Sequence, residues 1–371
     1  MNIDIIHQIL GTVKDLYLSR FGIRKLPRSI FWLITWKCNS RCLHCEWGKT
    51  GDELNKSQDM SRVVSLKRTK EVITEAKSWG ARHIAFAGGE PFLRDDFLKI
   101  LKHCKKEGYS VTVSTNGFLL SYPEFAQEVV ETGVDRIDIS LDAADALHDK
   151  LRGVKGAFAM VDKAIDNLNL LKKKRRFYLG INAIVSAQNM RKLDSLFEYA
   201  GKKRVDGIGL QPFHPVQARA KGLIPQFMIN KEQVIELKKI LKAIMDKYGA
   251  LLSNSPFFVK KIAEYYQDNK MPKEACYAGL QEIHIYPDGT VSTCCFLRGT
   301  QSVADMDLKE ILSGEGFKDI LNKAKNKECA GCWSPPVHEY NLLFKPLEFA
   351  SGLKLIRTFL KWTKEEPIEK V

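Results

Sequence analysis

Residues 29–45 read Ser-Ile-Phe-Trp-Leu-Ile-Thr-Trp-Lys-Cys-Asn-Ser-Arg-Cys-Leu-His-Cys, an apolar run followed at once by three cysteines. The run over 29–36 is rich in β-branched and aromatic residues, which predicts a buried strand. Cys38, Cys42 and Cys45 then lie on the loop after this strand. Three such thiolates can ligate three irons of a cubane cluster and leave the fourth iron without a protein ligand, whereas a cluster held by four cysteines only transfers electrons. The stretch therefore predicts a reactive iron–sulfur cluster at a strand end.

A zinc ion is the alternative for these thiolates. Zinc needs a fourth nitrogen or sulfur ligand, which a second closely spaced pair normally supplies. His44 lies between two of the cysteines and is badly placed to serve as that ligand. The spacing therefore favours the cluster.

A second strand and turn lie further along the chain. Residues 83–87, His-Ile-Ala-Phe-Ala, read as a strand that ends in Gly88-Gly89-Glu90-Pro91. Adjacent glycines allow a ligand to approach the backbone closely. Glu90 can accept a hydrogen bond from an ammonium group, and Pro91 stiffens the exit from the turn.

With these two motifs the chain resembles the radical S-adenosylmethionine (SAM) superfamily, which is marked by C-x3-C-x2-C after the first barrel strand and a GGEP-like motif after the second. The resemblance implies that Cys38, Cys42 and Cys45 hold a 4Fe–4S cluster. It also implies that the amino and carboxylate groups of SAM chelate the open iron, with Gly88, Gly89 and Glu90 around its methionine end.

Two further motifs extend the likeness in the same order. Val-Ser-Thr-Asn-Gly at 113–117 ends a third predicted strand, and Ile-Ser-Leu-Asp at 139–142 ends a fourth. In family members the serine of the second motif contacts the bound nucleoside, so Ser140 is the candidate for that role. The resemblance covers residues 29–335 approximately.

The order of predicted elements indicates the architecture. Strands are expected near 29–36, 82–87, 109–114, 135–141, 178–185 and 206–212, and helices near 66–79, 94–107, 123–133, 156–174 and 190–202. Such alternation is typical of parallel β/α units. Six units predict an α/β fold, a partial (β/α)6 TIM-like barrel with its site at the carboxyl ends of the strands. A doubly wound sheet is the alternative, but its G-x-G-x-x-G fingerprint is not found.

A second set of cysteines, Cys276, Cys294, Cys329 and Cys332, lies downstream. The Asp-Gly pair at 288–289 predicts a tight β-hairpin that brings Cys276 and Cys294 together. The spacing resembles a SPASM/Twitch auxiliary domain, and the absence of cysteines after Cys332 matches the one-cluster form. This resemblance implies a second, auxiliary 4Fe–4S cluster on these four thiolates. A structural zinc site is the alternative.

Two cysteines remain. Cys104 lies on an expected helix and is interpreted as a small core residue. Cys295 adjoins Cys294. A structural or unused role is favoured for it over ligation or substrate contact.

The motifs divide the chain into five expected segments. They are an amphipathic extension (1–28), the radical SAM core (29–215), a bridging helical region (216–270), the auxiliary-cluster domain (271–336) and a basic amphipathic extension (337–371). Basic amphipathic helices can lie in a membrane interface. The alternative is that both extensions cover the barrel.

Composition restricts the environment and the partners. The 371 residues carry a formal charge of +14 and nine cysteines. Unpaired thiols with cluster-type spacing indicate a reducing, cytoplasmic compartment. If the extensions bind a membrane, the protein is expected to lie at its inner face. Neither a secretory signal nor a bilayer-spanning run is found. The basic run at 172–176 is interpreted as a solvated helix end, so no nucleic-acid partner is expected.

The resemblance implies reductive cleavage of SAM to a 5′-deoxyadenosyl radical that abstracts hydrogen from a substrate carbon, with the auxiliary cluster as an electron conduit. A reductant such as ferredoxin or flavodoxin is the expected partner. A small or lipid-linked substrate, such as a sugar or lipid intermediate, is favoured. About 28 residues precede the first strand, fewer than a leader-binding domain needs. The alternatives are a peptide- or protein-modifying maturase and a non-catalytic zinc or electron-transfer protein. No catalytic proton acceptor is predicted.

Overall fold

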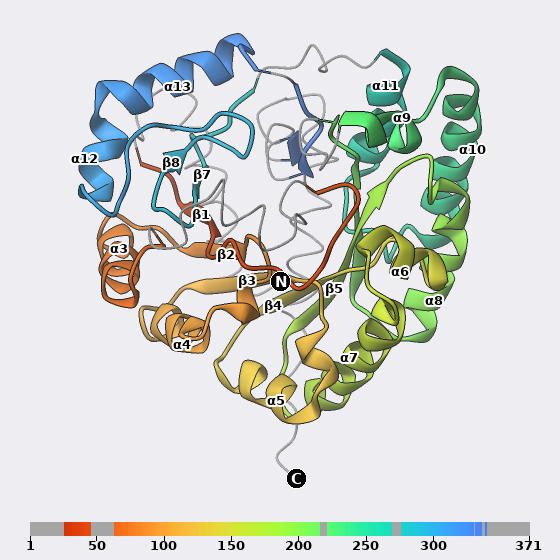
Figure 1. Ribbon diagram of the computed structural model, residues 1–371, viewed down its shortest axis with the longest axis horizontal. Helices are drawn as coiled ribbons and strands as arrows, with labels where there is room; N and C mark the ends of the chain where they lie inside the picture. The colour runs from red at the N-terminus through yellow and green to blue at the C-terminus, as the bar shows by residue number, and fades with distance from the viewer. Residues whose placement is uncertain are drawn as a thin grey trace, which may run out of the picture.

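The computed structural model describes residues 26–45, 63–215, 221–268, 276–329, 331–335 and 338–339. Within them eight strands form one curved sheet in the order β6-β5-β4-β3-β2-β1-β7-β8, with helices around its outer side (Figure 1). All neighbouring strands run parallel except β7 and β8. The strands are β1 (Ser29–Leu33), β2 (His83–Ala87), β3 (Ser110–Thr115), β4 (Arg136–Ser140), β5 (Tyr178–Val185), β6 (Gly207–Pro212), β7 (Glu282–Ile285) and β8 (Val291–Ser292).

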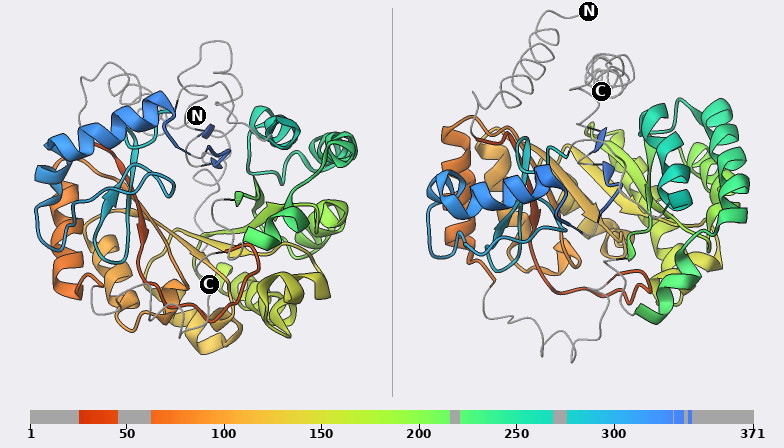
Figure 2. Two further views of the ribbon diagram at one scale, coloured as in Figure 1. Left: turned by 45° about the horizontal axis from the view of Figure 1, so that its top comes forward. Right: turned by 90° about the horizontal axis from the view of Figure 1, so that it is seen from above.

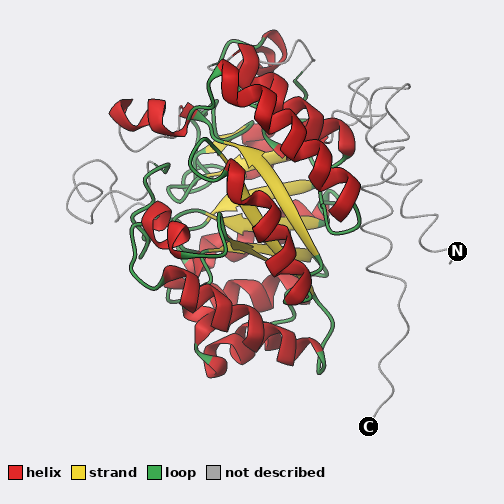
Figure 3. Cartoon of the chain, turned by 90° about the vertical axis from the view of Figure 1, so that its right-hand side faces the viewer, coloured by secondary structure: helices red, strands yellow, loops and turns green. Residues whose placement is uncertain are grey.

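Helices follow most strands and cover the sheet when the molecule is seen from the side (Figure 3). Those that alternate with the strands are α3 (Leu66–Ser78), α4 (Phe97–Lys106), α5 (Pro123–Glu131), α6 (Ala146–Arg152), α7 (Ala157–Lys172) and α8 (Leu193–Lys202). The later ones are α9 (Ile224–Phe227), α10 (Lys231–Tyr248), α11 (Pro256–Asp268), α12 (Leu308–Ser313) and α13 (Glu315–Asn326). Short 3-10 turns are η3 (Pro91–Leu93), η4 (Leu119–Ser121), η5 (Met190–Lys192) and η7 (Lys221–Leu223).

Local chemistry sets where several helices begin and end. The Ser65 hydroxyl accepts the Arg68 N–H at the start of α3, and Asn230 forms a capping box with Gln233 at the start of α10. Gly153 ends α6 in the left-handed conformation, which glycine adopts without a Cβ penalty.

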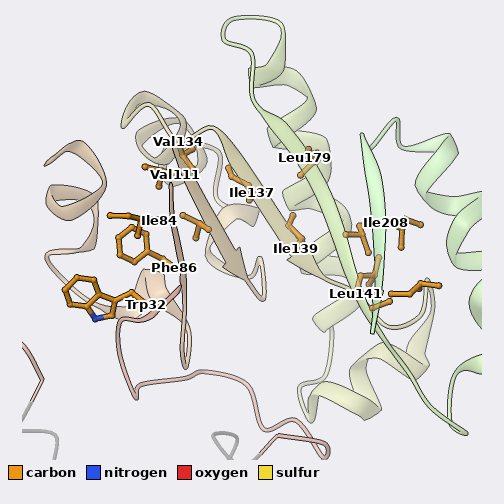
Figure 4. Packing of buried hydrophobic residues seen from close by; sticks show 14 of the residues in the cluster. Trp32, Ile84, Phe86, Val111, Val134, Ile137, Ile139, Leu141, Leu179 and Ile208 are labelled. Atoms are coloured by element: carbon orange, nitrogen blue, oxygen red, sulfur yellow. The ribbon is translucent and has the colours of Figure 1, made fainter. Parts of the chain in front are cut away.

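The core lies between the outer face of the sheet and the helices. Alternate strand residues such as Trp32, Ile84, Phe86, Ile137, Ile139 and Leu179 are fully buried there (Figure 4). Because side chains alternate along a strand, the other face carries the intervening residues. They include His83 and Thr112, whose Nε2 and Oγ1 atoms lie 3.0 Å apart. The inner face of the curved sheet therefore carries polar side chains, beside apolar ones such as Phe31 and Leu33.

The expected α/β architecture is confirmed: all six predicted strands are present, and they pair in parallel with one another within one sheet. The first strand ends at Leu33 instead of 36, because the backbone beyond it hydrogen-bonds with the turn after β2. The helix expected at 94–107 begins at Phe97, because Pro91–Leu93 forms a separate 3-10 turn.

The hairpin predicted at 288–289 is present as antiparallel β7 and β8. Its attachment was not predicted: β7 pairs in parallel with β1 and so extends the barrel sheet. The Ser29 hydroxyl supports this junction by donating to Glu282 Oε2 at 2.8 Å. Helices α12 and α13 then lie on the same side of the molecule as α3 (Figure 2).

The basic run at 172–176 begins at the last residue of α7 and continues into the turn after it. Arg175 donates to the carbonyl oxygens of Gly133 and Val134 at 2.6 and 2.7 Å, and the two lysines before it are exposed. This arrangement agrees with a solvated helix end that also supports its neighbours.

The two amphipathic extensions lie almost wholly outside the described residues, so their predicted contact with a membrane or with the barrel stays a prediction. None of the helices in the described part of the chain has the length and apolar content that a bilayer span requires.

Candidate cofactor site

The cysteine loop after β1 packs directly on the turn after β2. The Gly89 N–H donates to Thr35 O at 2.8 Å, and the Glu90 N–H donates to Lys37 O at 2.7 Å. A Cβ atom on Gly89 would lie 2.1 Å from Lys37 O, and Gly88 has a φ of +131°. The adjacent glycines are therefore required by backbone-to-backbone packing, in addition to the ligand approach for which they were singled out.

Glu90 connects this turn to the end of β3. Its carboxylate is buried and accepts from Thr115 Oγ1 at 2.7 Å, from the Asn116 N–H at 2.8 Å and from the Phe92 N–H at 3.3 Å. Burial raises the pKa of Glu90 to about 7, against the lowering effect of these donors. A carboxylate has about four acceptor sites, so these three donors leave little capacity for a ligand.

Asn116 continues the connection back to the cysteine loop. Its side-chain amide donates to Asn39 Oδ1 at 2.6 Å and to Ser40 Oγ at 3.1 Å. The first three motifs of the sequence thus meet at one end of the sheet.

The three thiols of the loop share one cationic neighbour. Cys42 is buried, and Cys38 and Cys45 are half-buried. Burial raises the pKa of Cys38 to about 12 and also raises that of Cys42. The guanidinium of Arg152 interacts electrostatically with all three, and its Nη1 lies 3.8 Å from Cys42 Sγ.

The fourth motif supplies the partner of this arginine. Asp142 follows β4 and pairs through Oδ2 with Arg152 Nη2 at 2.8 Å, while its Oδ1 accepts the Ile184 N–H at 3.0 Å. Burial acts to raise the pKa of Asp142, but Arg152 and neighbouring histidines lower it overall. Ser140, half-buried at the end of β4, lies two residues before this aspartate.

Arg152 was missed by sequence reasoning. It is a single arginine at the end of α6, without a spacing pattern that marks it. The one local signal is the glycine that follows it. Gly153 allows the end of α6 to approach the cysteine loop closely, because an added Cβ would lie 2.5 Å from Arg41 O.

The downstream cysteines also come together. Cys276 packs on the small cluster that contains Cys294. Cys332 interacts electrostatically with Cys276, Cys294 and Cys329. Burial raises the pKa of Cys276 to about 11 and raises that of Cys332. The predicted hairpin therefore brings Cys276 beside Cys294, and ligation of one cluster by the four thiols stays a prediction.

Histidines beside this second set had not been predicted. His338 Nε2 lies 3.9 Å from Cys332 Sγ, and its ring stacks on Trp333 with centroids 4.3 Å apart. His214, just after β6, accepts the Trp333 N–H at 3.1 Å, and burial lowers its pKa to about 4. Only the folded chain brings His214 to Trp333, 119 positions away, whereas His338 lies six positions after Cys332.

The remaining cysteines differ from each other. Cys104 is fully buried on α4, which confirms its interpretation as a core residue. Cys295 is half-buried, and its carbonyl accepts the Tyr286 hydroxyl at 3.2 Å. Among the described residues, no three histidine, cysteine, aspartate or glutamate side chains are arranged to hold a single metal ion.

The fold is a partial parallel barrel, with one set of cysteines after β1 and a second set around the β7–β8 hairpin. The family model of the radical SAM superfamily matches residues 32–199, and that of the SPASM iron–sulfur cluster-binding domain matches residues 276–333. The chain belongs to the radical SAM superfamily and carries a SPASM-type auxiliary domain. Its cofactors are 4Fe–4S clusters and SAM.

Several curated relatives match parts of the chain. An AdoMet-dependent heme synthase of Methanosarcina barkeri is 33% identical over 175 residues, which are 47% of each chain. An Fe-coproporphyrin III synthase of the same organism is 28% identical over 52% of this chain and 45% of its own. The chain thus spans about half the length of these two relatives. A probable GTP 3′,8-cyclase of Sulfurisphaera tokodaii is 28% identical over 76% of this chain and 84% of its own.

Solved structures share the fold at low identity. SuiB of Streptococcus suis with bound SAM has a TM-score of 0.60 at 17% identity, covering 89% of this chain and 77% of its own. Native anSMEcpe with bound AdoMet has a TM-score of 0.61 at 16% identity, covering 91% and 99%. These likenesses establish the common architecture and leave the substrate open.

Proposed function

We propose that this radical SAM enzyme abstracts hydrogen from a carbon of a small or lipid-linked biosynthetic intermediate, with its auxiliary cluster as an electron conduit. The observation that carries the proposal is the meeting of four strand-end motifs around the three-cysteine loop. Support for a small substrate comes from the names of the sequence relatives, which concern iron-coproporphyrin, heme and GTP.

Cys38, Cys42 and Cys45 are proposed as the ligands of the SAM-binding cluster. The donor set fits: three thiols gather beside one guanidinium and the loop has no fourth thiol, which suits a cluster with one iron free of protein ligands. When bound, the reduced cluster supplies the electron that cleaves SAM to methionine and a 5′-deoxyadenosyl radical.

The chain's own residues position the cofactor and exclude water. Gly88 and Gly89 keep the turn close to the cysteine loop, and Glu90 and Asn116 tie that turn to β3. We assign the backbone of Gly88, Gly89 and Glu90 to the methionine end of SAM, and Ser140 to its nucleoside. The buried Cys42 and Ser40 and the half-buried Cys38 and Cys45 limit the access of water to the reacting centre, as radical chemistry requires.

Cys276, Cys294, Cys329 and Cys332 are proposed as the four ligands of the auxiliary cluster. Their mutual electrostatic contact and the apolar packing around Cys294 suit a fully ligated, electron-transferring cluster. The proposal includes the division into five segments predicted from the sequence. It also includes a ferredoxin- or flavodoxin-type reductant and peripheral contact of the two extensions with a membrane.

The chemistry is tested by anaerobic incubation of the reconstituted full chain with SAM and dithionite. We expect release of 5′-deoxyadenosine, and its loss when Cys38, Cys42 or Cys45 is changed to alanine. Cys104→Ala is the control, because this thiol is buried as Cys42 is, but it lies on α4 in the hydrophobic core. Undiminished release from Cys42→Ala would contradict the ligand assignment.

The substrate class is tested separately with a defined panel of nucleotides, coproporphyrin, polyprenyl-phosphate sugars and unstructured peptides. The true class should increase 5′-deoxyadenosine release severalfold, and a deuterated substrate should transfer deuterium into the released nucleoside. Stimulation and transfer confined to peptides would overturn the small-substrate proposal in favour of a peptide-modifying maturase.

A further inference from the structure

A buried cation beside the cysteine loop has no part in the function proposed so far. The side chain of Arg152 is only 9% exposed, and that of its partner Asp142 is 2% exposed. Nη2 of the arginine faces the carboxylate at 2.8 Å, and Nη1 lies 3.8 Å from Cys42 Sγ, within donor range of a sulfur acceptor. The guanidinium therefore lies between a carboxylate and a thiol and contacts both.

The backbone holds this arrangement rigidly. The Arg41 N–H donates to Arg152 O at 2.9 Å, and the Leu43 N–H donates to Leu151 O at 3.0 Å. These two bonds flank Cys42 in the sequence. Gly153, with a φ of +64°, lets the end of α6 approach so closely that a Cβ would lie 2.5 Å from Arg41 O. The main chain thus holds the end of α6 against Cys42, and the ion pair with Asp142 orients the guanidinium there.

Asp142 is anchored through its carboxylate, which accepts the Ile184 N–H at 3.0 Å, and through its backbone, so the ion pair presents a fixed dipole. The Asp142 N–H donates to His148 Nδ1 at 3.2 Å, and its carbonyl accepts from Asn189 Nδ2 at 2.8 Å. Burial opposes the charged form of the arginine, but the carboxylate raises the pKa of Arg152 overall. The positive end of the pair faces the cysteine loop, where little water screens it.

We propose that Arg152 sets the reduction potential of the SAM-binding cluster by donating to Cys42 Sγ and presenting its positive charge to the loop. This inference rests on the proposed assignment of Cys42 as a cluster ligand. Hydrogen bonds to cluster sulfurs and nearby positive charge raise a cluster's potential, because one-electron reduction makes the cluster more negative. The electron comes from the ferredoxin- or flavodoxin-type reductant, which is oxidised by one electron. No covalent bond changes in this step.

The test is a spectroelectrochemical titration of the reconstituted full chain without SAM, followed by electron paramagnetic resonance. The protein is expected to give one signal from each of its two clusters. The signal that is lost in Cys42→Ala belongs to the SAM-binding cluster. Arg152→Met removes the charge and should lower the reduction potential by about 59 mV. At a fixed applied potential this raises the ratio of oxidised to reduced cluster about tenfold, because one electron is transferred. Arg152→Lys, which keeps the charge, should recover part of that shift.

Arg94→Met is the matched control. Arg94 is also a buried arginine in an ion pair, with Asp96 at 2.6 Å, and it donates to the carbonyl oxygen of Ile34. Its replacement should leave the potential unchanged at full iron content. An unchanged potential in Arg152→Met with full iron content would overturn the inference.

A second variant covers the case in which Arg152→Met does not load iron. Asp142→Asn removes the negative end of the pair and should move the potential in the opposite direction, upward. A downward or absent shift would also overturn the inference. If Cys42→Ala removes no signal at all, the ligand assignment fails, and that result is distinct from failure of the tuning role.

Discussion

At the scale of the residue, Gly89 has the least room for a side chain among the glycines of the site. Its backbone nitrogen bonds to Thr35 O, and an added methyl group would lie 2.1 Å from Lys37 O. The atom in the way is backbone and belongs to the residue before Cys38. A side chain at 89 can be accommodated only if the cysteine loop moves away from the turn.

We therefore expect Gly89→Ala to weaken SAM binding about tenfold or more and to destabilise the fold by about 2 kcal/mol. SAM affinity is measured by the change in the cluster's paramagnetic spectrum, and stability by urea unfolding. Gly201→Ala is the control, because a Cβ there meets nothing within 4 Å. Equal SAM affinity in the two variants would contradict the packing argument.

At the scale of the element, α3 holds the auxiliary segment on the barrel. Arg68 donates from Nε to Val303 O at 2.7 Å and from Nη2 to Met306 O at 2.8 Å. Glu75 accepts the N–H groups of Leu308 and Lys309, at 3.2 and 2.8 Å, so a side chain of α3 caps the first turn of α12.

Glu75→Ala should cost about 1–2 kcal/mol, because it leaves the first N–H groups of α12 uncapped and removes a negative charge from the helix's positive end. Hydrogen exchange of residues 308–313 is the direct readout and should become faster. Glu71→Ala on the same helix is the control, since Glu71 is exposed and pairs only loosely with Arg68, at 3.4 Å. Exchange that is equally fast in both variants would show that the cap is unimportant.

At the scale of the whole molecule, one sheet carries both cysteine sets. The first set follows β1, and the second flanks the hairpin whose β7 pairs with β1. Each set nevertheless has its own neighbours: Arg152 for the first, His214 and His338 for the residues around the second. Loading of the two sets should therefore be separable.

The double variant Cys329→Ser/Cys332→Ser should bind about four irons per chain instead of about eight, because only one of two 4Fe–4S clusters remains. Iron and sulfide analysis measures this, and the SAM-sensitive paramagnetic signal should persist. Cys104→Ser is the control and should retain full iron. Loss of all iron from the double variant, with the fold intact by circular dichroism, would show that the clusters depend on each other.

The sequence by itself determined the local elements and the motifs at their ends. Strand and helix positions follow from short-range patterns of apolar and β-branched residues, and these hold because every strand is buried on its outer face. The cysteine spacing and the Asp-Gly hairpin are likewise local. Parallel topology then places successive strand ends at one edge, so the placement of Cys38, Glu90 and Ser140 along that edge could be expected.

Only the tertiary structure decided which distant groups surround those motifs. The contact of Arg152 with Cys42 spans 110 positions, and that of Trp333 with His214 spans 119. Such contacts depend on where α6 ends and on how the chain returns after β8. A lone arginine or histidine carries no periodic signal, because its role comes from the backbone geometry that brings it there and from the burial that strengthens its charge or hydrogen bond.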